Sequence, residues 1–350
     1  MRNITLILVL LLCTHVLFAQ EADEQEFQTE EQLIIAEEPQ AVAAEQADEQ
    51  EESQTGITTA SSLNLQISSL PEAKLGFTQS FVFPFLQGQS PLTRDNNVNL
   101  ALTAEVSPIS MNGIIDVVWT PVAFFEFELG GRAGSGWNIN LGGPVYGIGI
   151  NQEEASDPVT GISSGKAEND GSPFDGLLWA ANAGGAIQMD LAALVPGDWN
   201  HVLFRTYHEI NYKGYSRAKN DQSWYFEDDF GENCNGFNYR GNLLLGYQMP
   251  KSPVFNLIAL QAEGELFLYD NILPGRDKWG DEKIRWTFSA IYNFSITKQF
   301  NITLIGQLRT MRNYTEQDWK DLYYRNRTID KSSPLRLEPY RVAAALTYKF

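Results

Sequence analysis

Outside its first twenty residues, the sequence lacks any long apolar run. No later stretch approaches the roughly 20 apolar residues that a transmembrane helix requires. Hydrocarbon cannot satisfy the free backbone groups at the edges of an open sheet. If the chain enters a membrane, it must therefore do so as a closed β-barrel.

Cysteine and histidine are also scarce, with two Cys and three His in 350 residues. Cys13 lies within the expected signal peptide, so no intrachain disulfide is predicted, and Cys234 is interpreted as a loop residue. His201 and His208 would face opposite sides of one strand and cannot share a site. We therefore predict no catalytic residues, no metal site and no cofactor, and we expect a protein that is not an enzyme.

Basic residues are too few for a nucleic-acid-binding protein. The 25 Lys and Arg residues stand against 44 Asp and Glu residues, a net charge of −19, whereas nucleic-acid binding needs a basic stripe. Much of the acidity lies in Glu21–Glu52, which holds 13 acidic residues and no Lys or Arg. Residues 20–55 are therefore predicted to form a disordered acidic leader, because they have too little apolar surface to bury.

The chain begins with the features of an exported protein. Arg2 precedes an apolar run from Ile4 to Ala19, and one positive charge, a short apolar core and a small terminal residue are typical of a secretory signal peptide. We predict a signal peptide at residues 1–19, a short N-terminal plug or linker at 56–74, and a barrel at 75–350.

From Leu75 onward, apolar and polar residues alternate with a period of two, the pattern of half-buried strands. Eight segments show it clearly. Four weaker candidates are Ile114–Thr120, Leu177–Asp190, Val202–Tyr212 and Ser223–Phe226. The predicted fold class is all-β, an antiparallel transmembrane β-barrel of about 12 strands, within a range of roughly 10–14.

Alternation also occurs in soluble sandwiches, whose apolar face points inward, whereas the apolar face of a membrane barrel meets lipid. Short connections alternate here with long ones, such as the segment from Gly134 to Phe174. Aromatic residues also stand at strand ends, where an interfacial girdle belongs: Phe81, Phe85, Trp119, Tyr247, Tyr348 and Phe350. Both features favour a barrel in the cell outer membrane, with outer-membrane lipid as its partner.

The last segment alternates up to the final residue. Its apolar face is predicted to hold Tyr340, Val342, Ala344, Leu346, Tyr348 and Phe350. A terminal aromatic residue after such a strand resembles the β-signal by which outer-membrane barrels are recognised for assembly. Tyr340, Leu346, Tyr348 and Phe350 are the expected assembly signal, with the barrel assembly machinery as its partner.

The polar faces of the predicted strands would line the lumen with charge. The candidate lumen residues are Glu126, Glu128, Arg132, Arg205, Arg240, Glu263, Glu265, Arg285, Arg309 and Arg341, with Glu105 and Lys349 in addition. They could set ion selectivity or bind a carboxylate headgroup, for which a guanidinium offers a two-point fit. Alternatively, they neutralise one another as a structural network that fills a narrow lumen.

Several strings resemble treponemal (spirochaete) outer-membrane proteins, a group regarded as similar to the FadL long-chain fatty acid transporters. They are Arg94–Val98, Ser107–Gly113, Trp119–Ala123, Gly134–Ile139, Gly147–Asn151 and Leu245–Pro250. The resemblance implies uptake of hydrophobic nutrients by a barrel with an N-terminal plug. Ser53–Leu70 carries no Asn-Pro-Ala hatch motif.

Two functions are therefore expected from the sequence. The first is a porin-like channel or transporter for small hydrophobic or amphipathic nutrients, fatty-acid-like in character. The alternative is a surface-exposed adhesin or structural barrel that transports nothing. An apolar lumen would favour the first, and a lumen filled with paired charges would favour the second.

Overall fold

A computed structural model describes residues 56–69, 72–140, 144–145, 147–153, 165–167, 173–174, 176–219, 223–227, 233–250, 252, 254–268, 280, 282–315 and 329–350. The expected signal peptide (1–19) and acidic leader (20–55) lie outside these residues. The described part contains no helix that is long and apolar enough to cross a membrane.

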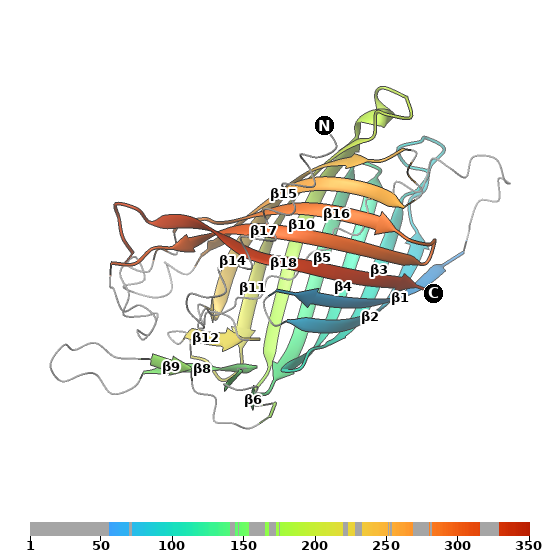
Figure 1. Ribbon diagram of the computed structural model, residues 1–350. Coiled ribbons are helices and arrows are strands. Elements are labelled where there is room, and N and C mark those ends of the chain that lie inside the picture. Colours follow the sequence, from blue (N-terminus) through green and yellow to red (C-terminus); the bar gives the residue numbers. More distant parts are fainter. Residues whose placement is uncertain are drawn as a thin grey trace.

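Twelve antiparallel strands close into a barrel, in the order β1-β18-β17-β16-β15-β14-β11-β10-β5-β4-β3-β2 (Figure 1). Their bounds are β1 Thr58–Ser68, β2 Ala73–Pro84, β3 Asn97–Val106, β4 Ser110–Val122, β5 Phe125–Gly136, β10 Leu178–Asp190, β11 Val202–Tyr215, β14 Gly236–Gln248, β15 Phe255–Phe267, β16 Arg285–Ser295, β17 Phe300–Arg312 and β18 Leu335–Lys349. The predicted barrel fold and its central strand number are confirmed.

Six short strands lie outside the barrel wall. They are β6 Ile139–Asn140, β7 Pro144–Val145, β8 Ile148–Glu153, β9 Gly165–Ala167, β12 Ser223–Phe226 and β13 Asn233–Cys234. Four of them form one sheet in the order β13-β12-β8-β9, and β6 pairs with β7. They belong to the two long connections that follow β5 and β11, at one end of the barrel (Figure 1).

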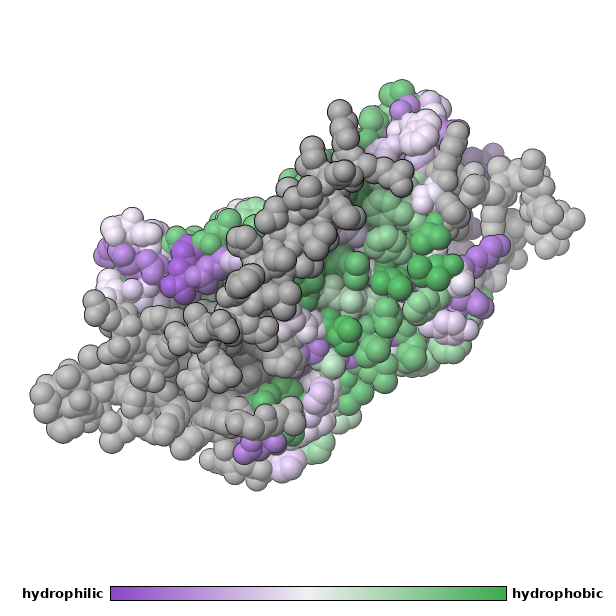
Figure 2. Space-filling model, viewed as in Figure 1, coloured by the Kyte–Doolittle hydropathy of each residue, from purple (hydrophilic) through white to green (hydrophobic). Residues whose placement is uncertain are grey.

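The barrel strands expose their apolar residues and bury their polar ones, the reverse of the arrangement in a soluble protein. On β14, Leu243 and Leu245 are exposed, whereas Asn238 and Arg240 are buried. Figure 2 shows the resulting apolar band as green surface over the barrel strands. Because apolar side chains face outward and charged ones inward, the surrounding medium is lipid, and the chain is an outer-membrane β-barrel.

Aromatic residues form clusters at both ends of this band. Phe85 and Phe127 each contact Trp119 at the short-turn end, with ring centroids 6.3 and 5.6 Å from that of Trp119. Tyr348 and Phe350 add a contact of 5.0 Å at the same end. At the other end, Trp179, Tyr212 and Phe237 are in contact at 4.9 Å for each neighbouring pair. Such clusters are typical of the interfacial girdles of membrane barrels.

One predicted strand lies outside the barrel, and one predicted boundary is wrong. Ser223–Phe226 is a strand, β12, but it pairs with β8 and β13 outside the barrel. The remaining barrel strand is β1, within the segment 56–74 that the sequence suggested as a plug or linker. β1 pairs with both β2 and β18 and closes the barrel. Its exposed large apolar residues are only Leu63, Leu65 and Ile67, so its alternation is short and weak.

The connections differ in length at the two ends of the barrel. The connections after β5, β11, β15 and β17 are long and lie at one end, together with the short ones after β1 and β3. The connections after β2, β4, β10, β14 and β16 lie at the other end, and the longest of them, from Phe85 to Asn96, has 12 residues. Outer-membrane barrels have short periplasmic turns and longer extracellular loops. The long-loop end therefore faces outward, and the short-turn end faces the periplasm.

Candidate functional site: the charged lumen and its mouth

The inner wall is organised in rows of residues that lie directly opposite one another on neighbouring strands. One row alternates in charge through Arg285, Glu265, Arg240 and Glu209 on β16, β15, β14 and β11. Opposite charges in directly opposed positions stabilise a sheet. This row links four neighbouring strands. The sequence predicted that several of these residues line the lumen, but it did not predict which of them pair.

Glu265 is the centre of this row and is 1% exposed. Its carboxylate contacts Arg285, lies 3.7 Å from both Arg240 Nε and Lys213 Nζ, and accepts a 2.7 Å hydrogen bond from Asn238 Nδ2. Three cations around one carboxylate leave this cluster with net positive charge. A buried carboxylate with this many partners is stable as an anion, whereas the cations would repel one another in its absence.

Acidic residues dominate the opposite part of the wall. Glu126 accepts hydrogen bonds from Gln188 at 2.9 Å and from Arg205 at 3.2 Å. Glu128 accepts one from Asn182 at 3.4 Å.

The inward acidic residues on β4, β5, β10 and β11 are Asp116, Glu126, Glu128, Asp190 and Glu209. The inward basic residues on β14, β16, β17 and β18 include Arg240, Arg285, Arg309, Arg312 and Arg341. The lumen therefore has a more acidic half and a more basic half, with Glu263 and Glu265 on β15 as acidic members of the basic half.

Tyr340 lies on the inner side of β18, which corrects its predicted place on the apolar face. A register irregularity between Gln307 and Leu308 leaves Tyr340 without a directly opposed residue on β17. The guanidinium groups of Arg309 and Arg341 lie over its ring, at 4.6 and 5.2 Å from the centroid. A bulge turns a side chain out of strict alternation, so the sequence pattern alone could not predict this orientation.

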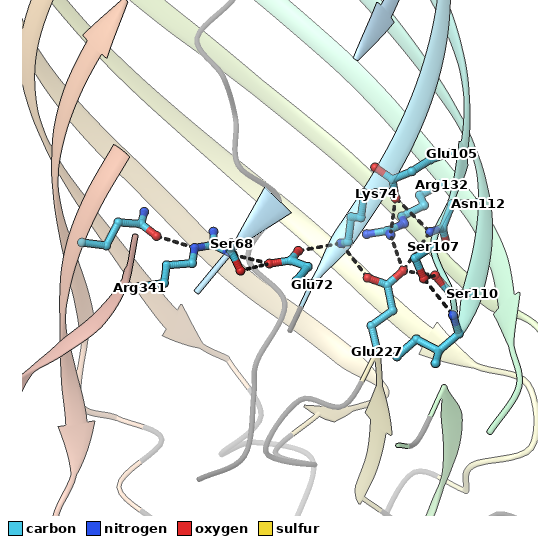
Figure 3. Close-up of polar contacts among 12 residues, drawn as sticks. Ser68, Glu72, Lys74, Glu105, Ser107, Ser110, Asn112, Arg132, Glu227 and Arg341 are labelled. Atoms are coloured by element: carbon cyan, nitrogen blue, oxygen red, sulfur yellow. Dashed lines mark hydrogen bonds and ion pairs between the residues drawn. The ribbon is translucent and has the colours of Figure 1, made fainter. Parts of the chain in front are cut away.

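A chain of polar contacts crosses the long-loop end of the lumen, and Figure 3 shows it. Arg341 on β18 contacts Glu72 at 3.0 Å, and Glu72 lies 3.3 Å from Lys74 Nζ on β2. Lys74 Nζ in turn lies 2.6 Å from an oxygen of Glu227. Glu227 follows β12 and comes from the long connection after β11, so this chain joins a loop to two regions of the wall.

Glu227 is held on its other side by strands β4 and β5. Its carboxylate accepts hydrogen bonds from Ser110 Oγ and, at 3.2 Å, from Asn112 Nδ2. Arg132 Nη2 lies 3.8 Å away and also contacts Glu105 at 3.4 Å. Both Lys74 and Glu227 are buried, so this is a carboxylate enclosed by two cations and two neutral donors.

The strand that precedes Glu227 is held by the small sheet outside the barrel. Trp224 and Phe226 of β12 pack with Ile148 of β8 and with Leu178 and Tyr215 of the wall. Glu227 itself has a φ of 52°, a left-handed conformation that costs a non-glycine residue about 1–2 kcal/mol. The contacts of its carboxylate must offset this cost, which indicates that these contacts stabilise the observed position of Glu227.

A glycine makes room for this arrangement. Gly134 on β5 lies directly opposite Asn112 on β4. A Cβ atom at position 134 would collide with the side chain of Asn112 and with the carbonyl oxygen of Met111. Any larger residue would therefore displace Asn112 from the hydrogen bond that it donates to Glu227.

Nearer the periplasmic end, the inner wall carries an apolar strip. It crosses six neighbouring strands through directly opposed residues: Ala343, Ile305, Ile291, Ala259, Gly246 and Leu203. Arg341 and Gln307 oppose each other two residues from Ala343 and Ile305, on the side of the long loops. Charged and apolar lining thus adjoin along the length of the lumen.

All ten predicted lumen residues face inward, and the structure brings several of them together. Glu126 pairs with Arg205, and Glu265 pairs with Arg240 and Arg285. Arg309 and Arg341 both lie over the ring of Tyr340. The sequence missed Glu72, Lys74, Glu209 and Glu227. Lys74 could have been found from the alternation of β2, but nothing local distinguishes Glu227 from the other acidic residues of its loop.

The scarce Cys and His residues lie apart from one another. Cys234 is a completely buried thiol outside any disulfide, in strand β13 beside Phe267, and not in a simple loop as predicted. His201 contacts Asp190 at 2.8 Å, whereas His208 lies on the outer face, 2.6 Å from Tyr239 Oη. Among the described residues, no group of His, Cys, Asp and Glu side chains could hold a metal ion.

No protein-family profile and no curated protein matches the chain. Among solved structures, the chain is similar to a KdgM porin, at 9% sequence identity and a TM-score of 0.37, over 84% of this chain and 99% of that one. It is also similar to the β-domain of the Bordetella autotransporter BrkA, at 10% identity and a TM-score of 0.36, over 84% and 98%. For outer membrane phospholipase A from Escherichia coli, the values are 11%, 0.28, 83% and 92%. These likenesses are too distant to transfer a substrate or an activity to this chain.

Proposed function

We propose that this outer-membrane β-barrel is a channel or transporter for small amphipathic solutes, fatty-acid-like in combining an acid group with an apolar part. The observation that carries the proposal is the inner wall, where charged rows toward the outside adjoin an apolar strip toward the periplasm. A solute with one charged and one apolar end can interact favourably with both regions as it passes.

The charge distribution of the wall supports selection as well as passage. Rings and rows of charged side chains set the selectivity of membrane channels. Here the more basic half carries Arg341 two residues from the strip residue Ala343, and Arg309 four residues from the strip residue Ile305. An acid group would therefore be attracted to the part of the wall that also offers apolar contact.

One observation favours the alternative of a structural or adhesive barrel. Many inward charges contact one another, as Glu126 does Arg205 and Glu265 does Arg285, and a barrel that transports nothing would also need such pairing to fill its interior. The apolar strip weighs against this alternative, because apolar residues have no evident role in a filled electrostatic network.

Solute flux into proteoliposomes separates the two functions. Liposomes that contain the purified full chain are transferred to isosmotic solutions of sodium hexanesulfonate, an amphipathic and permanently charged solute, or of sucrose. A channel of the proposed kind makes these liposomes swell several-fold faster than protein-free liposomes in hexanesulfonate, with a smaller effect in sucrose. Swelling at the protein-free rate in every solute would favour the structural or adhesive barrel.

We also propose that the barrel assembly machinery recognises the end of β18 through Leu346, Tyr348 and Phe350. Phe350 closes the last strand, with its backbone amide donating to Ser61 of β1 at 2.9 Å. Deletion of Phe350 should lower the amount of heat-modifiable protein in the outer membrane. A Phe350→Tyr variant, which keeps the aromatic ring, should assemble normally.

A further inference from the structure

We propose that Lys74, Ser110, Asn112 and Arg132 form a binding site for the carboxylate of an incoming solute, and that Glu227 occupies this site as a built-in competitor. The inference rests on the proposed channel function and specifies its ligand chemistry. It also makes the Glu227 carboxylate a latch that carboxylate solutes release.

The geometry around Glu227 is that of a carboxylate-binding site. Lys74 Nζ is 2.6 Å from one carboxylate oxygen, and the other oxygen accepts hydrogen bonds from Ser110 and Asn112. Arg132 lies 3.8 Å from the same oxygen. Charge-assisted hydrogen bonds of this kind are among the strongest available to a carboxylate. Nothing in this set of donors requires that the carboxylate belong to the protein.

The donors and the carboxylate come from different parts of the chain. Lys74 lies on β2, Ser110 and Asn112 on β4, and Arg132 on β5, all within the barrel wall. Glu227 belongs to a connection outside the wall, whose sheet packs against Leu178 and Tyr215 at the ends of their strands. The site can therefore persist in the wall when the carboxylate leaves it.

The charge of the wall also favours a replacement anion. Around the site, the wall contributes Lys74, Arg132 and Arg341 against Glu72 and Glu105. Counted over these described residues, the set is neutral with Glu227 and has one net positive charge without it. A buried cluster with an uncompensated charge is costly, so departure of Glu227 is favourable only when another anion takes its place.

The left-handed backbone of Glu227 indicates how the exchange can be reversible. Its φ of 52° is unfavourable for any residue but glycine, asparagine or aspartate, so the bound position of Glu227 carries strain that its departure relieves. Such strain is typical of segments that switch between two states. A solute carboxylate that supplies the same hydrogen bonds without this strain can compete with Glu227.

The test measures single-channel currents of the purified full chain in planar bilayers at constant ionic strength and pH 8. Hexanoate is compared with hexanamide, which has the same alkyl chain without the charge. In the wild-type protein, hexanoate should raise the open fraction several-fold and saturably, and hexanamide should not. This comparison needs no variant and therefore does not depend on the folding of one.

Three variants locate the effect. Glu227→Gln should be open without any solute, and hexanoate should reduce its current by occupying the vacant site. Lys74→Gln should also be open, but hexanoate should leave its current unchanged. The control is Glu282→Gln at the same end of the barrel, where Glu282 is exposed and pairs with Lys283; it should behave as the wild type does.

The possible failures are distinguishable. Equal responses of the wild-type channel to hexanoate and hexanamide, or identical behaviour of Glu227→Gln and Glu282→Gln, would overturn the carboxylate site and leave the channel intact. Absence of current in every variant, together with liposomes that do not swell, would overturn the channel itself and the inference with it.

Discussion

The outer and inner faces of the barrel are made by the same twelve strands, yet they follow different rules. On the outer face, every strand meets one medium, and residues such as Leu245 and Leu260 are apolar and exposed throughout. On the inner face, the composition changes from row to row, from the alternating charges around Glu265 to the apolar strip around Ile305. The outer face is therefore uniform in composition, whereas the inner face is specific, because each of its rows has its own set of residues.

This difference determines how substitutions act on each face. An outward residue contributes through the transfer of its own surface into lipid, and its neighbours matter little. An inward charged residue contributes through its partners, and its loss leaves those partners buried and uncompensated. The effects of outer substitutions should therefore follow hydropathy and depth, whereas those of inner substitutions should follow the contacts.

The largest effect is expected on the inner face, at Glu265. A Glu265→Gln substitution leaves Arg285, Arg240 and Lys213 facing one another without their shared anion. The barrel should lose about 3–5 kcal/mol in its free energy of unfolding, measured by denaturant titration in lipid vesicles. The matched control is Glu338→Gln, whose partner Arg336 lies in a half-exposed pair and whose loss should cost at most about 1 kcal/mol. Equal costs would contradict the role of the row.

On the outer face, an arginine in the lipid band should be the most damaging change. Leu260 on β15 is 64% exposed, and a Leu260→Arg substitution should cost about 2–4 kcal/mol if that position lies near the bilayer midplane. Leu194 is 67% exposed, but it lies in the connection between β10 and β11. Leu194→Arg should cost no more than about 1 kcal/mol, since the penalty falls toward the interface. The same titrations measure both, and similar costs would mean that the apolar band is wrongly placed.

Tyr340 provides a smaller and sharper test, because the two faces predict different results for it. Replacement by Leu would be neutral for a residue that faces lipid. For the inward Tyr340, which lies under two guanidinium groups, Tyr340→Leu should cost about 1–2 kcal/mol. A double-mutant cycle with Arg309→Met isolates the interaction, and a coupling energy near zero would contradict the inward position.

The uniform face explains why the fold could be predicted from the sequence. Alternation such as Phe237, Tyr239 and Leu243 against Asn238 and Arg240 needs no knowledge of neighbours, and it correctly indicated the barrel. The prediction missed β1, where only three large apolar residues alternate with Ser, Asn and Gln. β1 is a strand because it pairs with the edges of both β2 and β18. This pairing depends on the folded arrangement of the chain and cannot be seen in the local sequence.

The specific face explains why the site could be predicted only in part. Alternation showed which charged residues face inward, but the pairing of Glu265 with Arg285 depends on the register between strands. Lys74 and Glu227 are 153 positions apart in the sequence and meet only because a loop folds onto the wall. Tyr340 was misplaced because a register irregularity in β18 interrupts the period of two.

If solutes reach an inner face whose residues alternate with lipid-facing ones, thiol labelling along β17 should distinguish the two faces. Single cysteines replace Thr303, Leu304, Gln307 or Leu308 in a Cys234→Ser background, and the proteins in liposomes are exposed to a charged, membrane-impermeant methanethiosulfonate. Position 307 faces inward and is partly exposed, so it should be labelled, and the buried inward position 303 should be labelled more slowly. Positions 304 and 308 face lipid and should not be labelled. Labelling of 304 and 308 alone, or of none of the four, would contradict a solute-accessible lumen behind this wall.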